Sequence, residues 1–467
     1  MMIQDTNHNL PIAIIGAGPV GLAAAAHAVE RGLTPLVLER GDGPGAAMRA
    51  WGHVRLFSPW GHNTDAAAQR LLAASGWTAP AAEQLPSGAD MVDDYLAPLA
   101  ALPALAPHLR FGATATAVSR VGHDRMSTAG RAEAPFVLRW RDSDGIAHSD
   151  QVRAVIDASG TWHTPGPMGI DGLPVAGEQA LASRIAYGIP DVLGSEQPRY
   201  AGLRVLVVGG GHSAMNAVLD LLRLAELDPR TTLTLALRRA GLERLAGGGA
   251  DDGLPARGAL GLAARNAAQA GRLRLLAPFA AHRLGAKGDA LVVMGTAAGQ
   301  PFEDSFDRLV VATGFRPDRA LLDELRLELD PVTEAPVRLA PLIDPNVHSC
   351  GTVPPHGVAE LTHPEPNLWV VGAKSYGRAP TFLMKTGYEQ VRSIVAELAG
   401  DHAAARRVEL VLPETGVCSG PGPAADAGCC GGPAATEDAC CVADEEAKAA
   451  GQSGCGCTAP AAKSCCG

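Results

Sequence analysis

Short apolar runs interrupted by glycine-rich turns form the strongest pattern in the sequence. The run Ile12–Ile15 is followed by the turn GAGPVG at 16–21, then by an alanine-rich stretch, then by a second apolar run, Pro35–Leu38. Short continuous apolar runs are typical of strands buried on both faces of a parallel sheet. The order of these segments predicts a strand, a glycine-rich turn, a helix and a second parallel strand.

The glycines of this turn have the spacing of a dinucleotide-binding loop. Gly16 allows the tight turn, Gly18 lets a pyrophosphate approach the backbone, and Gly21 lets the helix pack closely on the strand. The amino end of the helix attracts phosphate groups. Glu39, directly after the second strand, can accept hydrogen bonds from a ribose. A chance glycine cluster would not be followed by a helix, a strand and an acid in this order, so we predict a dinucleotide site.

The same pattern recurs in the middle of the chain. The apolar run Leu203–Val208 precedes the turn GGGHSA, and another apolar run follows at Thr231–Leu237. Alanine is permitted at the third glycine position of such a loop. The pattern predicts a second dinucleotide-binding loop with its three key positions at Gly209, Gly211 and Ala214.

The second copy ends in two cations where the first ends in an acid. Arg238 and Arg239 follow the run Thr231–Leu237 directly. Guanidinium groups suit the additional 2′-phosphate of NADP, which a carboxylate would repel. The alternative is a strand end that is merely solvated. We favour the phosphate interpretation because the pair lies inside a complete nucleotide-binding pattern.

Two similar segments flank the second copy. Val155–Pro165 and Leu309–Asp318 each contain an apolar run, small residues, a glycine and a proline. This arrangement is expected of the two chain crossings between one domain and a second domain inserted in it. We therefore predict an α/β protein with two Rossmann-like dinucleotide-binding domains, the first formed by 1–165 and 318–412 and the second by 166–317.

In these features the chain resembles the flavoproteins with two dinucleotide-binding domains, which include flavin-containing monooxygenases and thioredoxin-reductase-like enzymes. The resemblance covers roughly residues 10–412 and implies FAD on the first domain and NADPH on the second. It also implies that the segment VGAK at 371–374 contacts the flavin, although the usual acid after its glycine is missing, and that a helix beginning near Thr381 points its amino end at the flavin. The residues expected at the cofactors are Gly16, Gly18, Gly21, Glu39, Arg40, Gly160, Gly209, Gly211, Ser213, Ala214, Arg238, Arg239, Gly314, Gly372 and Thr381.

The sequence departs from several subgroups of this superfamily. No cysteine precedes Cys350, so the second domain lacks the C-x-x-C pair of a thioredoxin reductase, and the first helix lacks the redox pair of a glutathione-reductase-type enzyme. The segment before the second glycine loop lacks the Phe and His of the F-x-G-x-x-x-H pattern of typical flavin-containing and Baeyer–Villiger monooxygenases. Electrons should therefore pass directly from the flavin to a substrate, to oxygen or to the C-terminal tail.

A closer resemblance lies in the segments RYAGLRVLVVGGGHSA, HSCGTVPPHGVAEL and KSYGRAPTFLMKTGYEQV, together with the cysteine-rich tail. These resemble the flavin-dependent monooxygenases of bacterial arsenic-resistance operons. The resemblance implies an enzyme that uses NADPH and FAD to oxidise a trivalent arsenical to the pentavalent form. Such an enzyme must deliver hydride to the flavin and keep water from its reactive state.

Candidate residues for the reaction chamber come from three segments. In the superfamily the region of Met48–Asn63 covers the flavin, and here it holds Trp51, Arg55, Ser58 and Trp60; the alternative is a loop held by buried tryptophans. The other two segments hold Cys350 with His348 and His356, and Lys374 with Tyr376 and Arg378. A thiolate at Cys350 would suit arsenic(III), although a buried free cysteine is as good an explanation. The last three side chains could hold an oxyanion product or cap the following helix. We take Cys350, Arg55 and Tyr376 as the candidate catalytic residues.

The formal charge of −10 argues against a nucleic-acid or acidic-membrane partner and leaves a small molecule as the expected substrate. The amino end shows no secretory pattern, and the apolar stretch Leu96–Pro107 is too short to span a bilayer. We expect a cytoplasmic protein in which thiols stay mostly reduced. The sequence leaves the oligomeric state open.

The tail at 413–467 has a different composition from the rest of the chain. Nine of the ten cysteines lie from Cys418 onward, among Ala, Gly and Pro. A segment with so few large apolar residues cannot offset its ordering entropy, so we expect it to be disordered. Adjacent thiols can chelate soft ions such as arsenic(III), mercury(II) or copper(I). The predicted ligands are Cys429, Cys430, Cys440, Cys441, Cys455, Cys457, Cys465 and Cys466.

Three functions remain open from the sequence. The first is an NADPH- and FAD-dependent monooxygenase acting on a soft thiophilic substrate. The second is a flavin-dependent reductase of tail disulfides or of a bound metal ion. The third is a non-catalytic flavoprotein that senses metal or redox state. The missing core cysteine pair favours the first over the second.

Overall fold

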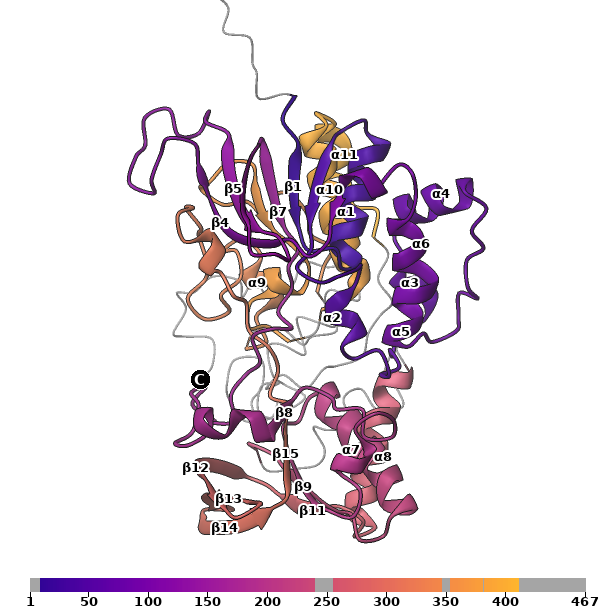
Figure 1. The fold of residues 1–467 in the computed structure, drawn as a ribbon, viewed down its shortest axis with the longest axis vertical. Helices are drawn as coiled ribbons and strands as arrows, with labels where there is room; N and C mark the ends of the chain where they lie inside the picture. Colours follow the sequence, from indigo (N-terminus) through magenta and orange to yellow (C-terminus); the bar gives the residue numbers. More distant parts are fainter. Residues whose placement is uncertain (1–8, 240–254, 347–352, 381, 411–467) are drawn as a thin grey trace, which may run out of the picture. The chain divides into compact units, whose positions relative to one another are not determined.

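The computed structural model describes residues 9–239, 255–346, 353–380 and 382–410, all within the unit Met1–Cys418 (Figure 1). A first parallel sheet draws its strands from both flanks of the predicted inserted domain. Its strand order is β16-β7-β1-β2-β3. The strands are β1 (Ile12–Ile15), β2 (Pro35–Leu38), β3 (Leu109–Arg110), β7 (Ala154–Asp157) and β16 (Leu368–Val370). The central strand β1 pairs in parallel with β2 and with β7.

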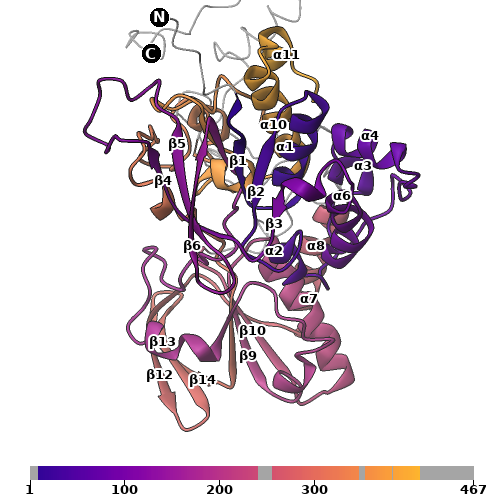
Figure 2. The ribbon, with the colours of Figure 1, turned by 45° about the horizontal axis from the view of Figure 1, so that its top comes forward.

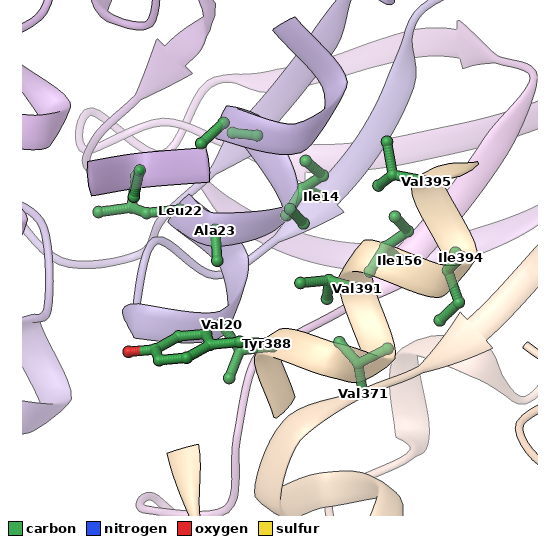
Figure 3. Packing of buried hydrophobic residues seen from close by; sticks show 14 of the residues in the cluster. Ile14, Val20, Leu22, Ala23, Ile156, Val371, Tyr388, Val391, Ile394 and Val395 are labelled. Carbon is green, nitrogen blue, oxygen red and sulfur yellow. The ribbon is translucent and has the colours of Figure 1, made fainter. Parts of the chain in front are cut away.

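Two helices far apart in the sequence pack together against this sheet. Helix α1 (Pro19–Glu30) and helix α10 (Met384–Leu398) are in extensive contact (Figure 3). The alanines at 23–26 of α1 are fully buried, and such small side chains allow close approach between helices. Ile14 and Ile156 of the sheet lie in one apolar cluster with Val391 of α10. The core of the first domain therefore joins the start and the end of the described chain.

Shorter helices and an antiparallel sheet complete the first domain. The helices between β2 and β3 are α2 (Ala46–Arg49), α3 (Trp60–Asn63), α4 (Ala66–Ala74), α5 (Gly88–Asp90), the π-helix η2 (Met91–Leu96), α6 (Ala97–Ala100) and η3 (Ala106–His108). The antiparallel sheet, visible in Figure 2, contains β4 (Thr114–Arg120), β5 (Phe136–Arg141) and β6 (Ala147–Val152). After the inserted segment come η8 (Ala320–Leu322), α9 (Ala340–Ile343), η9 (Gly372–Tyr376) and α11 (His402–Arg406).

A second parallel sheet is formed wholly by residues within 166–317. Its strand order is β11-β10-β9-β15-β8. The strands are β8 (Ile185–Tyr187), β9 (Arg204–Val208), β10 (Thr232–Ala236), β11 (Arg274–Leu276) and β15 (Arg308–Val311). The other elements are η4 (Gln179–Arg184), η5 (Gln197–Arg199), α7 (His212–Leu227), α8 (Pro255–Gln269) and an antiparallel sheet of β12 (Phe279–Lys287), β13 (Ala290–Ala297) and β14 (Gln300–Phe306).

The structure shows the predicted fold class of two Rossmann-like parallel sheets, each with the strand–turn–helix–strand order read from the sequence. The exact domain boundaries remain a prediction. One element boundary differs: the helix expected to begin near Thr381 begins at Met384. Among the described residues, no helix has the length and apolar character needed to cross a bilayer.

Candidate functional site

The first glycine loop has the shape that a dinucleotide requires. Gly16 has a φ of +103°, and an added Cβ there would lie 2.7 Å from the carbonyl oxygen of Ala158. An added Cβ at Gly21 would lie 1.9 Å from the carbonyl oxygen of Gly16. At Gly18, by contrast, no described residue other than its two chain neighbours comes within 4 Å of an added Cβ. The loop is therefore closed toward the protein and open above Gly18, where α1 begins, so it fits a pyrophosphate group.

Glu39 is oriented toward the same loop. Its Oε2 accepts a hydrogen bond from the backbone N–H of Ala17 at 2.8 Å, and its Oε1 accepts one from Gly41 at 2.8 Å. A carboxylate can accept further bonds at both oxygens. Glu39 thus shapes the loop itself and keeps acceptor capacity for a ribose. Arg40, the next residue, is exposed.

The second glycine loop repeats this geometry. Gly209 has a φ of +141°, and an added Cβ would lie 2.3 Å from the carbonyl oxygen of Ala312. At Gly211, no described residue other than its chain neighbours lies within 4 Å of an added Cβ. Ala214 is fully buried in α7, and Ser213 lies beside it in the first turn, partly exposed. The second loop therefore also fits a pyrophosphate group.

Arg238 and Arg239 follow β10, the strand next to β9 in the second sheet. Both side chains are exposed. The second strand of a dinucleotide-binding fold ends near the adenosine ribose. The two guanidinium groups are thus on the correct strand to meet a 2′-phosphate.

The two predicted chain crossings lie against each other. The backbone N–H of Gly166 donates to the carbonyl oxygen of Gly314 at 2.7 Å, and the N–H of Arg316 donates to that of Thr164 at 2.8 Å. Gly160 and Gly314 have φ values of +68° and +100°, which favour glycine. The chain therefore enters and leaves the second sheet through one hydrogen-bonded pair of segments.

A buried polar network holds the segment at Gly372, which follows β16. The N–H of Gly372 donates to Oε1 of Gln390 in α10 at 2.8 Å. The amide nitrogen of Gln390 donates to Ser375 Oγ at 3.0 Å and lies 2.9 Å from Nε2 of His356. Burial lowers the pKa of His356, so a neutral ring can accept at Nε2 while Nδ1 donates to the carbonyl oxygen of Pro354. His356, which the sequence grouped with Cys350 as a candidate for the reaction chamber, therefore helps to position Gly372.

The amino end of α10 meets the first glycine loop. An added Cβ at Gly387 would lie 2.6 Å from Cγ2 of Val20 and 2.7 Å from Cζ of Phe382. Lys385 lies in the first turn of α10, and burial lowers its pKa. Burial and the charge of Lys385 both lower the pKa of His62, against the opposing charge of Glu83. A helix amino end with a lysine is an electropositive environment suited to the negative charge of a reduced flavin.

The candidate residues from the Met48–Asn63 segment differ in how far they are exposed to solvent. Arg55 is exposed, and its Nη1 donates to the carbonyl oxygen of Leu85 at 2.8 Å. Trp51 is partly buried, and Trp60 is buried in the apolar core. Ser58 is also buried and donates to Oδ1 of Asn63 at 2.7 Å. The buried-tryptophan interpretation thus describes Trp60 well, whereas Arg55 is the most exposed of these four residues. Its catalytic role remains a prediction.

Tyr376 is buried, with its ring between His356 and Phe382 at centroid distances of 5.6 and 5.2 Å. Burial raises its pKa, so its hydroxyl stays protonated at neutral pH. Arg378 pairs with Glu334, and Lys374 is buried against Asp157. The role proposed for Tyr376 is untested by this geometry.

Several predicted site residues lie outside the described residues. They are Cys350, His348 and Thr381 and the predicted metal ligands Cys429, Cys430, Cys440, Cys441, Cys455, Cys457, Cys465 and Cys466. Among the residues that the structure does describe, no cluster of three or more His, Cys, Asp or Glu side chains could hold a metal ion.

Sequence reasoning missed the junction of Val20, Gly372 and Gly387 and the Gln390 network. One signal was available, because Gly387 lies inside a helical pattern, where glycine is unfavourable unless close packing requires it. The long-range partners of Gln390 leave no such local signal.

Comparisons with known proteins agree with this geometry. A family model described as pyridine nucleotide-disulphide oxidoreductase matches residues 13–110. Bacillithiol disulfide reductase from Bacillus cereus superposes with a TM-score of 0.60 at 17% identity, covering 84% of this chain and 99% of that one. Cadaverine monooxygenase from Erwinia amylovora gives 0.59 at 14% identity, covering 87% and 98%. A mutant flavin monooxygenase from Stenotrophomonas maltophilia gives 0.53 at 23% identity, covering 84% and 98%.

The fold is therefore that of the flavoproteins with two dinucleotide-binding domains, as predicted. The family match and the two fitting loops support a flavin-dependent oxidoreductase that uses FAD and NADPH. The resemblance to arsenic-resistance enzymes is not tested by these comparisons and stays a prediction.

Proposed function

We propose that this protein is an NADPH- and FAD-dependent monooxygenase that oxidises a soft, thiophilic small molecule such as a trivalent arsenical. The observation that carries the proposal is the pair of open glycine loops in a chain with no cysteine before Cys350. Neither loop has a neighbouring cysteine pair in the sequence to take electrons from a flavin. Oxygen or a bound substrate then becomes the acceptor.

Each part of the site has a task in this proposal. The open space above Gly18 and the amino end of α1 would hold the FAD pyrophosphate, with Glu39 on the ribose. Gly211 and α7 would hold the pyrophosphate of NADPH. Bound FAD supplies the chemistry of hydride acceptance and of electron transfer to oxygen. Lys385 and the amino end of α10 would stabilise the negative charge of the reduced flavin.

Oxygen consumption tests the proposed reaction. Purified protein with NADPH and a trivalent arsenical should consume oxygen in step with NADPH oxidation and yield the pentavalent product. Omitting the arsenical should lower both rates together. NADPH oxidation that continues at full rate without oxygen would contradict a monooxygenase.

A second candidate function is a flavin-dependent reductase of tail disulfides or of a bound metal ion. It is favoured by the disulfide oxidoreductase family model and by the fold similarity to a bacillithiol disulfide reductase. A chain truncated after Pro413 separates the two functions. If the tail only captures substrate, truncation should raise KM while turnover persists at saturating arsenical, because the tail supplies only local concentration. Loss of turnover at every substrate level would favour the reductase.

Replacing Arg238 and Arg239 together with alanine should raise the KM for NADPH by at least roughly 10- to 100-fold, because even a single charge-assisted contact to a phosphate contributes about 1.5–3 kcal/mol. The KM for NADH should change little, since NADH lacks the 2′-phosphate. Steady-state kinetics with both nucleotides measure the difference. Arg230→Ala is the matched control, because Arg230 precedes the same strand and pairs with Asp228 at 2.7 Å. Equal losses with NADPH and NADH would refute the assignment.

A further inference from the structure

Lys374 and Asp157 form a buried ion pair at the carboxyl end of the first sheet. Nζ of Lys374 lies 2.7 Å from Oδ2 of Asp157, and the two side chains are 1% and 0% exposed. Nζ also donates to Oγ of Ser159 at 3.0 Å, and that hydroxyl donates to Oδ1 of Asp157 at 2.6 Å. Asp157 ends β7, and Lys374 lies in η9, which follows the neighbouring strand β16. The pair therefore joins the loops that leave two adjacent strands.

These two loops contact opposite ends of the first glycine loop. The carbonyl oxygen of Ala158, directly after Asp157, lies 2.7 Å from the Cβ position of Gly16. On the other side, the Cβ position of Gly372 lies 3.5 Å from Cγ2 of Val20, in the first turn of α1. The ion pair thus links the segment at Ala158, which contacts the turn, to the segment at Gly372, which contacts the start of α1. The turn and the helix start are the two parts of the loop that border the open space above Gly18.

We propose that Lys374 and Asp157 are positioning residues for FAD, holding the glycine loop in the shape that accepts the pyrophosphate. This inference rests on the proposed function, in which the first loop binds FAD. Neither side chain needs to touch the cofactor. Loss of the lysine charge would leave the buried carboxylate of Asp157 without its cation, and the loop from Asp157 to Gly160 would rearrange to solvate it.

The other end of β16 provides a built-in comparison. Glu365, which precedes β16, pairs with Arg131 at 2.8 Å, with exposures of 1% and 3%. This pair is as buried as the Lys374 pair but lies at the amino end of the strand, away from Gly372. Breaking either pair should destabilise the first domain. Only the pair at the carboxyl end should alter FAD binding.

The test is the rate at which the purified holoprotein releases FAD, followed by the fluorescence of free flavin. We expect Lys374→Met to accelerate FAD release by roughly 10- to 100-fold. Breaking a buried ion pair costs enough free energy to change an equilibrium constant by more than about 100-fold, and only part of that cost should fall on the glycine loop. The Kd for NADP⁺, measured on the same holoprotein, should stay the same. Arg131→Met should lower Tm and leave FAD release unchanged. Equal release from wild type and Lys374→Met, or equal acceleration by Arg131→Met, would overturn the inference.

Ser159→Ala provides a milder variant in case Lys374→Met does not fold. It removes one hydrogen bond from each partner but keeps the ion pair, so FAD release should accelerate by roughly 3- to 10-fold with little change in Tm. Unchanged release in this variant would also overturn the inference. A wild-type protein that binds no FAD would instead overturn the proposed function, which separates the two failures.

Discussion

Gly18→Val should fold normally and fail to bind FAD. Apart from the two neighbouring residues, no described atom lies within 4 Å of a Cβ added at Gly18, so the protein leaves room for a side chain there. The same space is needed by the pyrophosphate, which must approach the backbone closely. We expect the purified variant to be colourless, with flavin absorbance at least about 100-fold below that of wild type, while circular dichroism and Tm match flavin-free wild type.

Gly211→Val is the matched control for this prediction. It places the same side chain in the equivalent open space of the second loop. This variant should retain FAD and lose NADPH-dependent flavin reduction. Gly18→Val protein that purifies with full flavin would show that the first loop is not the FAD site.

Glu365→Gln should lower the free energy of unfolding of the first domain by about 3–5 kcal/mol, because it leaves two buried arginines without their counter-charge. Glu365 lies 2.7 Å from Nε of Arg120 and 2.8 Å from Nη2 of Arg131. Denaturant unfolding followed by tryptophan fluorescence measures the loss. Glu334→Gln is the matched control, since Glu334 also pairs with two arginines, Arg319 and Arg378, but is 28% exposed. That change should cost at most about 1 kcal/mol.

The same carboxylate gives the unfolding free energy a predictable pH dependence. Burial alone would raise the pKa of Glu365, but the hydrogen bonds from Arg131 and Arg120 outweigh burial, and its net pKa is lowered. A group whose pKa is lower when folded stabilises the protein above its unfolded pKa. This contribution is therefore complete at neutral pH and is lost as the pH falls through the lowered pKa. Glu365→Gln should remove that acid dependence, and an unchanged pH profile would contradict the role of the pair.

The two nucleotide folds were predictable from sequence because their loops demand glycine. Gly16 and Gly209 have positive φ values and lie against backbone carbonyl oxygens, so no other residue fits. Such a constraint leaves a visible pattern in one short segment. The parallel strands were equally visible, because β1 and the last four residues of β9, Val205–Val208, are apolar and buried.

The ion pair of Lys374 and Asp157 was not predictable, because it joins residues that are far apart in the sequence. Lys374 and Asp157 are 217 positions apart, and neither of the segments that contain them shows that the two side chains pair. The sequence suggested that Lys374 holds an oxyanion product or caps the following helix, whereas the fold buries it against Asp157. The start of α10 lies three residues after Thr381, near which it was expected, and its cap, Leu383, has no polar side chain that could mark the start in the sequence.

The paired crossings at Thr164–Gly166 and Gly314–Arg316 have a mechanical consequence. Each crossing is one segment of backbone, and the hydrogen bonds between the two segments join them into a single connection. Two segments joined in this way can bend together, whereas sliding one segment along the other would break the hydrogen bonds between them. Both ends of the segment between the crossings are therefore tied at one place, so a movement of that segment that keeps these hydrogen bonds must turn about both crossings together.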